Sequence, residues 1–111
     1  MNECSRFEIS MLMDIYSSLL TDKQKDIMDL YYNDDLSLSE IAELNKTSRQ
    51  AIHDLIKRCD KQLLSYESKL NLLQKSKSKK EAIINFLDMM KEDYSVKDED
   101  IIKYKDILEN L

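Results

Sequence analysis

The chain has 111 residues with a formal net charge of −5, and it contains neither glycine nor proline. Because tight hairpin turns depend on residues that tolerate positive φ, chiefly Gly, Asn and Asp, this composition favours an all-α fold over a sheet protein. The lack of glycine also excludes the Gly-rich loops with which P-loop and dinucleotide-binding enzymes approach phosphate groups.

Two helices are predicted in the first third of the chain. Apolar residues at helical spacing indicate an amphipathic helix over residues 6–20. The tetrapeptide Thr21-Asp22-Lys23-Gln24 is typical of a capping box, in which the first and fourth side chains satisfy free backbone donors at a helix start. It predicts a second helix that ends near residues 33–35, where short polar side chains favour a turn.

The capping pattern recurs twice in the middle of the chain. Ser37-Leu38-Ser39-Glu40 predicts a short third helix, which breaks at Asn45-Lys46. Thr47-Ser48-Arg49-Gln50 predicts a long fourth helix over residues 48–74. The apolar residues of that helix alternate in steps of four and three, which is the spacing of a coiled-coil seam. The seam consists of Ile52, Ile56, Cys59, Leu63, Tyr66, Leu70 and Leu73.

This seam allows two arrangements. It can pack against its mate in a homodimer, or against the first and fifth helices of its own chain. We expect the homodimer, because a helix of about 27 residues projects about 40 Å, beyond a small globular core.

The last third of the chain begins with the basic run Lys75-Ser76-Lys77-Ser78-Lys79-Lys80, for which we expect a solvated loop or frayed link. Apolar residues at helical spacing then predict a fifth helix, and a sixth that follows a capping Ser95. We therefore expect a helix-turn-helix domain with an extended recognition helix over residues 1–74. A basic link and an acidic C-terminal helical extension occupy residues 75–111.

Charge is distributed unevenly along the chain. Residues 1–45 carry 10 acids and 3 bases, residues 46–80 carry 3 acids and 10 bases, and residues 81–111 carry 9 acids and 4 bases. For binding a polyanion the local patch matters more than the net charge. The middle third is therefore the predicted nucleic-acid-binding part.

The segment 37–57 has the arrangement of a helix-turn-helix. Small Ala42 suits a close crossing of the two helices, and apolar Ile41 and Ile52 suit the contact that fixes their angle. The second helix can then project the polar face of its first turns into a major groove. The candidate nucleic-acid-binding residues are Lys46, Ser48, Arg49, Gln50, His53, Lys57 and Arg58.

Five of these side chains have a chemistry that suits a specific DNA contact. Arg49 is expected to donate to guanine or phosphate, and Gln50 to pair with adenine. Lys46, Lys57 and Arg58 are expected to contact phosphates.

Three motifs lie within residues 20–63: Leu20-Thr21-Asp22-Lys23-Gln24, Leu36-Ser37-Leu38-Ser39-Glu40-Ile41-Ala42-Glu43 and Ser48-Arg49-Gln50-Ala51-Ile52. In these motifs the segment resembles region 4 of bacterial sigma factors, a four-helix module that binds the −35 promoter element.

A second set of motifs covers the first two-thirds of the chain: Leu30-Tyr31-Tyr32, Asp34-Asp35, Ser48-Arg49-Gln50-Ala51, Ile56-Lys57-Arg58 and Leu63-Leu64-Ser65-Tyr66-Glu67-Ser68-Lys69-Leu70. In these the chain is still more similar to the YlxM family. That resemblance implies a bacterial helix-turn-helix regulatory protein that acts beside the signal recognition particle, because the family's genes lie beside that of the particle's GTPase.

The turn departs from the pattern of these families. Its usual form has an apolar residue followed by Gly or Asn, whereas Leu44-Asn45-Lys46-Thr47 moves the apolar residue forward by one position. We expect Asn45 to take the left-handed conformation that the turn requires. The predicted fold is thus all-α, a sigma-region-4-like helix-turn-helix bundle with a long fourth helix and C-terminal helices.

Asp54 favours an alternative function. Its carboxylate lies among the predicted phosphate contacts and would repel a DNA backbone, as in a module that has kept the fold and changed its partner. In that alternative the chain binds RNA or protein of the signal recognition particle, and RNA is contacted mainly through shape and backbone.

The sequence does not suggest an enzyme. His53 is the only histidine, and Cys4 and Cys59 are far apart, so neither a four-ligand zinc site nor a nucleophile–base pair is indicated. We expect no cofactor and no metal. The acidic start and the absence of a long apolar run predict a cytoplasmic protein without a membrane anchor.

Overall fold

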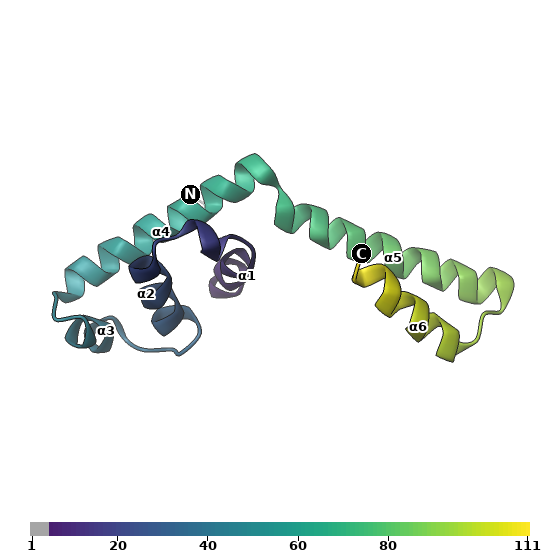
Figure 1. Ribbon diagram of the computed structural model, residues 1–111, viewed down its shortest axis with the longest axis horizontal. Coiled ribbons are helices and arrows are strands. Elements are labelled where there is room, and N and C mark those ends of the chain that lie inside the picture. The colour runs from purple at the N-terminus through teal and green to yellow at the C-terminus, as the bar shows by residue number, and fades with distance from the viewer. Residues whose placement is uncertain (1–4) are drawn as a thin grey trace. The chain divides into compact units, whose positions relative to one another are not determined.

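A computed structural model describes residues 5–111, which form α-helices, one 3-10 turn and no strand (Figure 1). The predicted all-α fold is therefore confirmed. By contact the chain divides into two compact units, one that ends at Leu73 and one that spans Gln74–Leu111. The elements are α1 (Arg6–Tyr16), η1 (Ser17–Leu19), α2 (Asp22–Tyr32), α3 (Leu38–Leu44), α4 (Arg49–Leu70), α5 (Leu72–Tyr94) and α6 (Asp98–Glu109).

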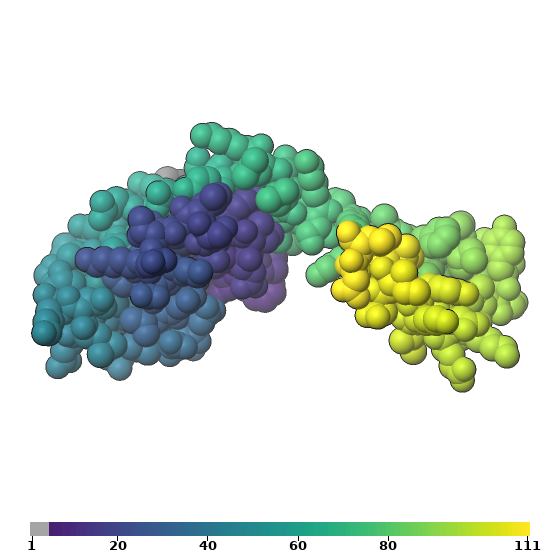
Figure 2. All heavy atoms as spheres, viewed as in Figure 1, coloured from purple at the N-terminus to yellow at the C-terminus, as the bar shows by residue number. Residues whose placement is uncertain are grey.

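The first unit is built around α4, against which α1, α2 and α3 all pack. One side of α4 is apolar at intervals of three and four residues, so it presents a continuous stripe to the three shorter helices. In Figure 2 the atoms of these helices, coloured from purple to teal, form one continuous body. The core consists of Ile9, Leu12, Met13, Tyr16, Leu20, Ile27, Met28, Ile41, Ala42, Ile52, Ile56, Cys59 and Leu63.

Two of the three predicted capping boxes are confirmed. At the start of α2, the Gln24 N–H donates to Thr21 Oγ1 at 3.2 Å, and the Thr21 N–H donates to Gln24 Oε1 at 3.0 Å. Ser37 and Glu40 exchange the same pair of bonds at 3.1 and 3.0 Å at the start of α3. These four bonds satisfy backbone donors that a helix start leaves free.

The third predicted capping box is wrong, because the N-cap lies one residue later and no reciprocal side-chain bond forms. Ser48, rather than Thr47, is the N-cap of α4, and its Oγ accepts from the Ala51 N–H at 3.1 Å. The residue three positions after the cap is therefore Ala51, which has no side-chain acceptor to return a bond. The start of α4 has a simple serine cap.

Arg6 connects α1 to α2 and to the loop that follows it. The Arg6 guanidinium donates to the Tyr31 carbonyl at 2.6 Å and to Asp35 Oδ1 at 3.1 Å. It also lies 4.5 Å from the ring centroid of Tyr31 and 4.9 Å from that of Tyr32, within the range of cation–π attraction. One exposed cation thus fixes the end of α2 to the first helix.

The predicted fourth helix over residues 48–74 is interrupted at Asn71. That residue takes a left-handed conformation, with φ 54° and ψ 29°, which asparagine tolerates better than most residues. α4 therefore ends at Leu70, and Leu73 belongs to α5. Tyr16 and Glu67 satisfy the new helix start: the Leu72 N–H donates to Tyr16 Oη at 3.2 Å and the Leu73 N–H to Glu67 Oε1 at 3.0 Å.

The second unit consists mainly of α5 and α6. The predicted basic link over residues 75–80 is wrong, because this stretch lies within α5. Lysine is a good helix former, and exposed side chains leave its charge solvated while the backbone stays helical. The predicted cap at Ser95 is also wrong. Ser95 has φ 54°, and the N-cap of α6 is Lys97, which forms no side-chain capping bond.

No helix of the described range has both the length and the apolar character that crossing a lipid bilayer requires.

Candidate nucleic-acid interface

The turn between α3 and α4 is closed by backbone hydrogen bonds. The Thr47 N–H donates to the Ala42 carbonyl at 3.0 Å, and the Lys46 N–H donates to the Glu43 carbonyl at 3.3 Å. This pair of bonds is the Schellman motif, which needs one residue in the left-handed conformation just after the helix. Lys46 is that residue, with φ 53°.

The prediction that Asn45 takes the left-handed conformation is therefore wrong by one position. Asn45 has φ −97° and ψ 5°, and it acts instead through its side chain. Its Nδ2 donates to the Ile41 carbonyl at 2.8 Å, a carbonyl that also accepts the Asn45 N–H at 3.0 Å. The turn thus remains tight although a lysine stands where glycine is usual.

α3 and α4 pack against each other, and the small side chain of Ala42 is buried, as predicted for a residue at their crossing. Ala42, Ile41 and Ile52 are all buried at this crossing, with exposed fractions of 5% or less. Leu55 is half-buried and packs against the same core. Because these apolar groups fix the angle between the helices, the polar side of α4 has a defined direction.

A row of polar side chains lies on α4 opposite its buried stripe. Gln50, Asp54, Lys57 and Lys61 follow one another at intervals of four, three and four residues, and all four are exposed. Lys61 was not among the predicted contacts, although its spacing from Lys57 would have identified it. Three further residues of α4 flank this row: Arg49, His53 and Arg58. We call the row and its three flanking residues together the outward face of α4.

The predicted contacts thus divide between the turn and this face. Lys46 is exposed in the turn, and Ser48 is exposed at the N-cap. Because Ser48 Oγ already accepts the Ala51 N–H, its remaining capacity is that of an O–H donor, which suits a phosphate oxygen. Ser48 therefore both stabilises α4 and retains a group for binding.

Asp54 binds two of the predicted contact residues. Its Oδ1 accepts a hydrogen bond from Gln50 Nε2 at 2.9 Å and lies 3.4 Å from His53 Nδ1. The side-chain amide predicted to read adenine therefore already donates a hydrogen bond to another side chain of the same helix. An approaching base would have to compete with an exposed carboxylate for the Gln50 amide.

The cations of the outward face are not neutralised by ion pairs. Over residues 5–111, no carboxylate forms an ion pair with Arg49, Lys57 or Arg58. α3 carries Glu40 and Glu43 and no cation. Hydrogen bonds from Ser37 hold the pKa of Glu40 below its usual value, so the carboxylate stays ionised. Positive charge in this part of the fold is therefore confined to α4 and Lys46.

The seam on α4, which we expect from its spacing to pair with a second chain, lies mostly in the core of its own chain. Ile52, Ile56, Cys59 and Leu63 are at most 3% exposed within a single chain. Their partners are α1, as in the alternative arrangement, and α2 and α3 in place of its fifth helix. A dimer through these four residues would require the domain to open.

Two of the three remaining seam residues and the seam cysteine agree with this arrangement. Tyr66 and Leu73 pack at the edge of the same core, whereas Leu70 is 46% exposed. Burial raises the pKa of the Cys59 thiol, which favours its neutral form. Cys59 therefore serves as a small core hydrophobe. Among the described residues, no three His, Cys, Asp or Glu side chains form a group that could hold a metal ion.

Comparison with known proteins places the chain in a family. The sequence profile of a family described as "Putative helix-turn-helix protein, YlxM / p13 like" matches residues 3–107. A UPF0122 protein of Clostridium botulinum (strain Alaska E43 / Type E3) is 74% identical over 106 residues, covering 96% of this chain and 97% of the relative.

Other clostridial relatives cover most of the chain at lower identity. A UPF0122 protein of Clostridium perfringens (strain SM101 / Type A) is 60% identical over 92% of this chain and 90% of its own length. One of Clostridium kluyveri (strain ATCC 8527) is 50% identical over 88% and 91%. The resemblance to the YlxM family is confirmed: the chain belongs to the YlxM/p13-like helix-turn-helix family.

Proposed function

We propose that this protein binds duplex DNA through the outward face of α4. The observation that carries the proposal is a closed α3–α4 turn followed by exposed, unpaired cations on the next helix. In helix-turn-helix proteins the second helix enters the major groove with its first residues against base edges. Here those residues are Arg49 and Gln50.

The cations divide into two roles by position. Arg49 lies in the first turn of α4, where a guanidinium can reach guanine or a flanking phosphate. Lys57, Arg58 and Lys61 lie further along the helix and contact the phosphate backbone, with Lys46 as an additional contact from the turn. Because phosphate contacts release counterions, binding of this kind weakens steeply with salt.

Asp54 supports a second candidate, an RNA- or protein-binding role at the signal recognition particle. Its exposed carboxylate stands in the middle of the outward face and opposes the approach of a DNA backbone to that face. A basic partner surface, or a structured RNA held by its shape, would place Asp54 away from phosphates. In the DNA-binding proposal, Asp54 must instead accept from a cytosine amine or remain bound to Gln50.

The test is retention of a random duplex library by the full chain at low salt, followed by a salt titration of the retained duplex. We expect Arg49→Ala and Lys57→Ala each to reduce the slope of log affinity against log salt by about 0.9, the value for one lost phosphate contact. Lys25→Ala is the matched control, because Lys25 is exposed on α2 outside the turn.

The same assay separates the two candidates. Absence of duplex retention even at low salt contradicts the DNA-binding proposal. In a parallel assay the full chain is offered signal recognition particle RNA and protein in place of the duplex. Retention of either, lost in Arg49→Ala and kept in Lys25→Ala, would then support the second candidate.

A further inference from the structure

The second unit leaves most of its apolar side chains uncovered. All of Gln74–Leu111 is described, and Ile83 and Leu87 are its only buried residues. On α6, Ile101 and Leu108 are half-buried, and their spacing of seven residues places them on one face. A unit of about 40 residues usually needs a disulfide, a metal or a further chain to be stable.

An ion pair marks one side of the α5–α6 pair. Lys91 Nζ on α5 lies 2.7 Å from Asp98 Oδ1 on α6. Ile84 precedes Lys91 by seven residues, and Ile102 follows Asp98 by four, so helical periodicity places both isoleucines on the same side as the ion pair.

The opposite side carries the larger apolar group. Successive residues of a helix are rotated by about 100° about the helix axis. Each of α5 and α6 therefore has one flank near the ion pair and one flank away from it, and the two flanks away from it lie on this opposite side. The apolar side chains on these two flanks are spaced three residues apart on α5 and three apart on α6. We call them the apolar face: Phe86 (49% exposed), Met89 (47%), Tyr104 (44%) and Ile107 (52%).

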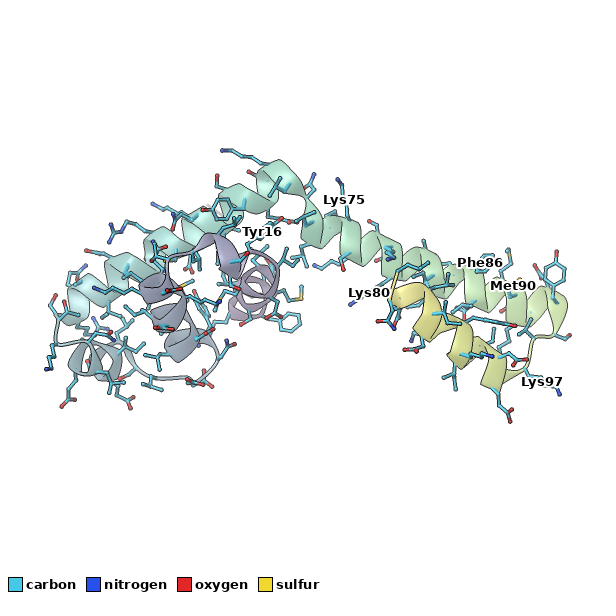
Figure 3. All side chains as sticks on the ribbon, in the orientation of Figure 1. Tyr16, Lys75, Lys80, Phe86, Met90 and Lys97 are labelled. Carbon is cyan, nitrogen blue, oxygen red and sulfur yellow. The ribbon has the colours of Figure 1, made fainter. Side chains whose placement is uncertain are left out.

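Charge changes sign along the same unit. The beginning of α5 carries four lysines and no acid over residues 75–80. The other end, around the α5–α6 turn, carries five acids against the two bases Lys91 and Lys97; the acids are Glu92, Asp93, Asp98, Glu99 and Asp100. In Figure 3, Lys75 and Lys80 mark the basic end, Lys97 the turn, and Phe86 the stretch between them.

We propose that the apolar face binds the apolar face of a second copy of this chain, with the two helix pairs antiparallel about a twofold axis near Phe86. Two helix pairs closed in this way form a four-helix bundle with an apolar interior. A twofold axis places the same residues on both sides of the interface.

Charge complementarity selects the second copy and its orientation. About an axis at Phe86, Lys79 of one chain, seven residues before it, comes level with Asp93 of the other, seven residues after it. The basic beginning of each α5 thereby lies beside the acidic turn of its partner, whereas a parallel arrangement would place like charges together. This dimer uses none of the residues of the α4 seam, and its test involves no DNA.

The first measurement is sedimentation of the full chain over a range of about 1 μM to 500 μM. We expect reversible association to twice the monomer mass of 13.2 kDa. A concentration-independent monomer over this range overturns the proposal.

Two matched substitutions test the face. Phe86→Glu places a charge in the interface, and we expect it to raise the dissociation constant at least about 100-fold. Ile84→Glu introduces the same charge two residues earlier, on the side of the Lys91–Asp98 ion pair, and we expect at most about a twofold change. Equal effects of the two variants, or a dimer that survives Phe86→Glu, overturn the assignment.

A charge exchange tests the orientation with exposed residues alone, so it does not depend on how Phe86→Glu folds. We expect Lys79→Glu to weaken the dimer about tenfold at low salt and the double variant Lys79→Glu/Asp93→Lys to restore it. Restoration supports the antiparallel arrangement. Failure of the second change to restore association overturns it.

Discussion

The Gln50 side-chain amide donates a hydrogen bond to Asp54 Oδ1 at 2.9 Å, one helical turn further along α4. The bond joins the residue best suited to read adenine to the one residue of the outward face that repels phosphate. In the protein without bound DNA, the Asp54 carboxylate and the Gln50 amide partly satisfy one another's hydrogen-bonding capacity. Removing the carboxylate therefore changes both the electrostatics of the face and the freedom of the amide.

We expect Asp54→Asn to raise the affinity for non-specific duplex DNA about three- to tenfold at low salt, because one negative charge leaves a cationic face. Fluorescence anisotropy with a labelled duplex measures the change. Asp26→Asn on α2 is the matched control, since it removes the same charge from an exposed position outside the face. Equal gains in the two variants would show that only net charge matters. A loss of affinity would indicate that Asp54 itself accepts from a base.

Lys46 combines a backbone requirement with a proposed phosphate contact, and two substitutions separate these roles. Lys46→Gly removes a β-carbon from a left-handed position, so we expect the free energy of unfolding to rise by up to about 1 kcal/mol. Lys46→Ala keeps the β-carbon and gains no such stability. Both variants lose the charge, so both should show a salt slope reduced by about 0.9. Urea titrations and the binding assay measure the two effects, and unequal slopes would contradict the proposed contact.

The capping boxes at Thr21 and Ser37 were predictable from the sequence, whereas closure of the turn was not. The boxes at Thr21 and Ser37 depend on residues three apart, so the chain carries the whole signal. Whether Asn45 or Lys46 takes positive φ depends on which carbonyl the Thr47 N–H reaches. That choice is made by the packing of α3 on α4, and no single-residue preference contains it.

The seam on α4 shows a second limit of sequence reasoning. Ile52, Ile56, Cys59 and Leu63 were correctly predicted to be buried, but the same heptad spacing serves a partner chain or the chain's own helices. The lysine run 75–80 shows a different error, one of secondary structure. Its charge suggested a loop, whereas solvation of lysine side chains and a helical backbone are compatible. The Gln50–Asp54 bond could have been predicted from its spacing of four residues.

Tyr16 fixes the point where α4 ends and α5 begins. Its Oη donates to Glu67 Oε1 at 2.6 Å and accepts the Leu72 N–H at 3.2 Å. We expect Tyr16→Phe to speed hydrogen exchange of the Leu72 amide about tenfold and to lower Tm by about 4–8 °C, the shift for one net hydrogen bond in a domain of this size. Tyr66→Phe is the control, because the Tyr66 ring lies 5.9 Å from that of Tyr16 but its hydroxyl forms no hydrogen bond with any of residues 5–111. Similar losses in both variants would contradict the role of the Tyr16 hydroxyl.

Asp60 makes the stability of the first unit depend on pH. Tyr32 Oη donates to Asp60 Oδ1 at 2.8 Å and to Oδ2 at 2.9 Å, in a half-buried site. Burial raises the pKa of Asp60 above its ordinary value of 3.8, while the Tyr32 hydrogen bond and the charges of Lys57 and Arg6 offset part of the rise. The folded state therefore binds this proton more tightly than the unfolded state does.

The sign of the pH dependence follows from this difference. The stability that the protonated carboxyl contributes is fully present below pH 3.8 and is lost as the pH rises through the higher folded value. The unfolding free energy of the wild type, minus that of Asp60→Asn, should therefore fall between about pH 3 and pH 7. Tyr32→Phe removes a donor to the ionised carboxylate and raises the pKa of Asp60 further. The difference in unfolding free energy between Tyr32→Phe and Tyr32→Phe/Asp60→Asn should therefore fall by more over the same pH range. Urea titrations across this range measure both differences. A difference that grows with pH would mean that the hydrogen bond and the two cations outweigh burial at this carboxyl.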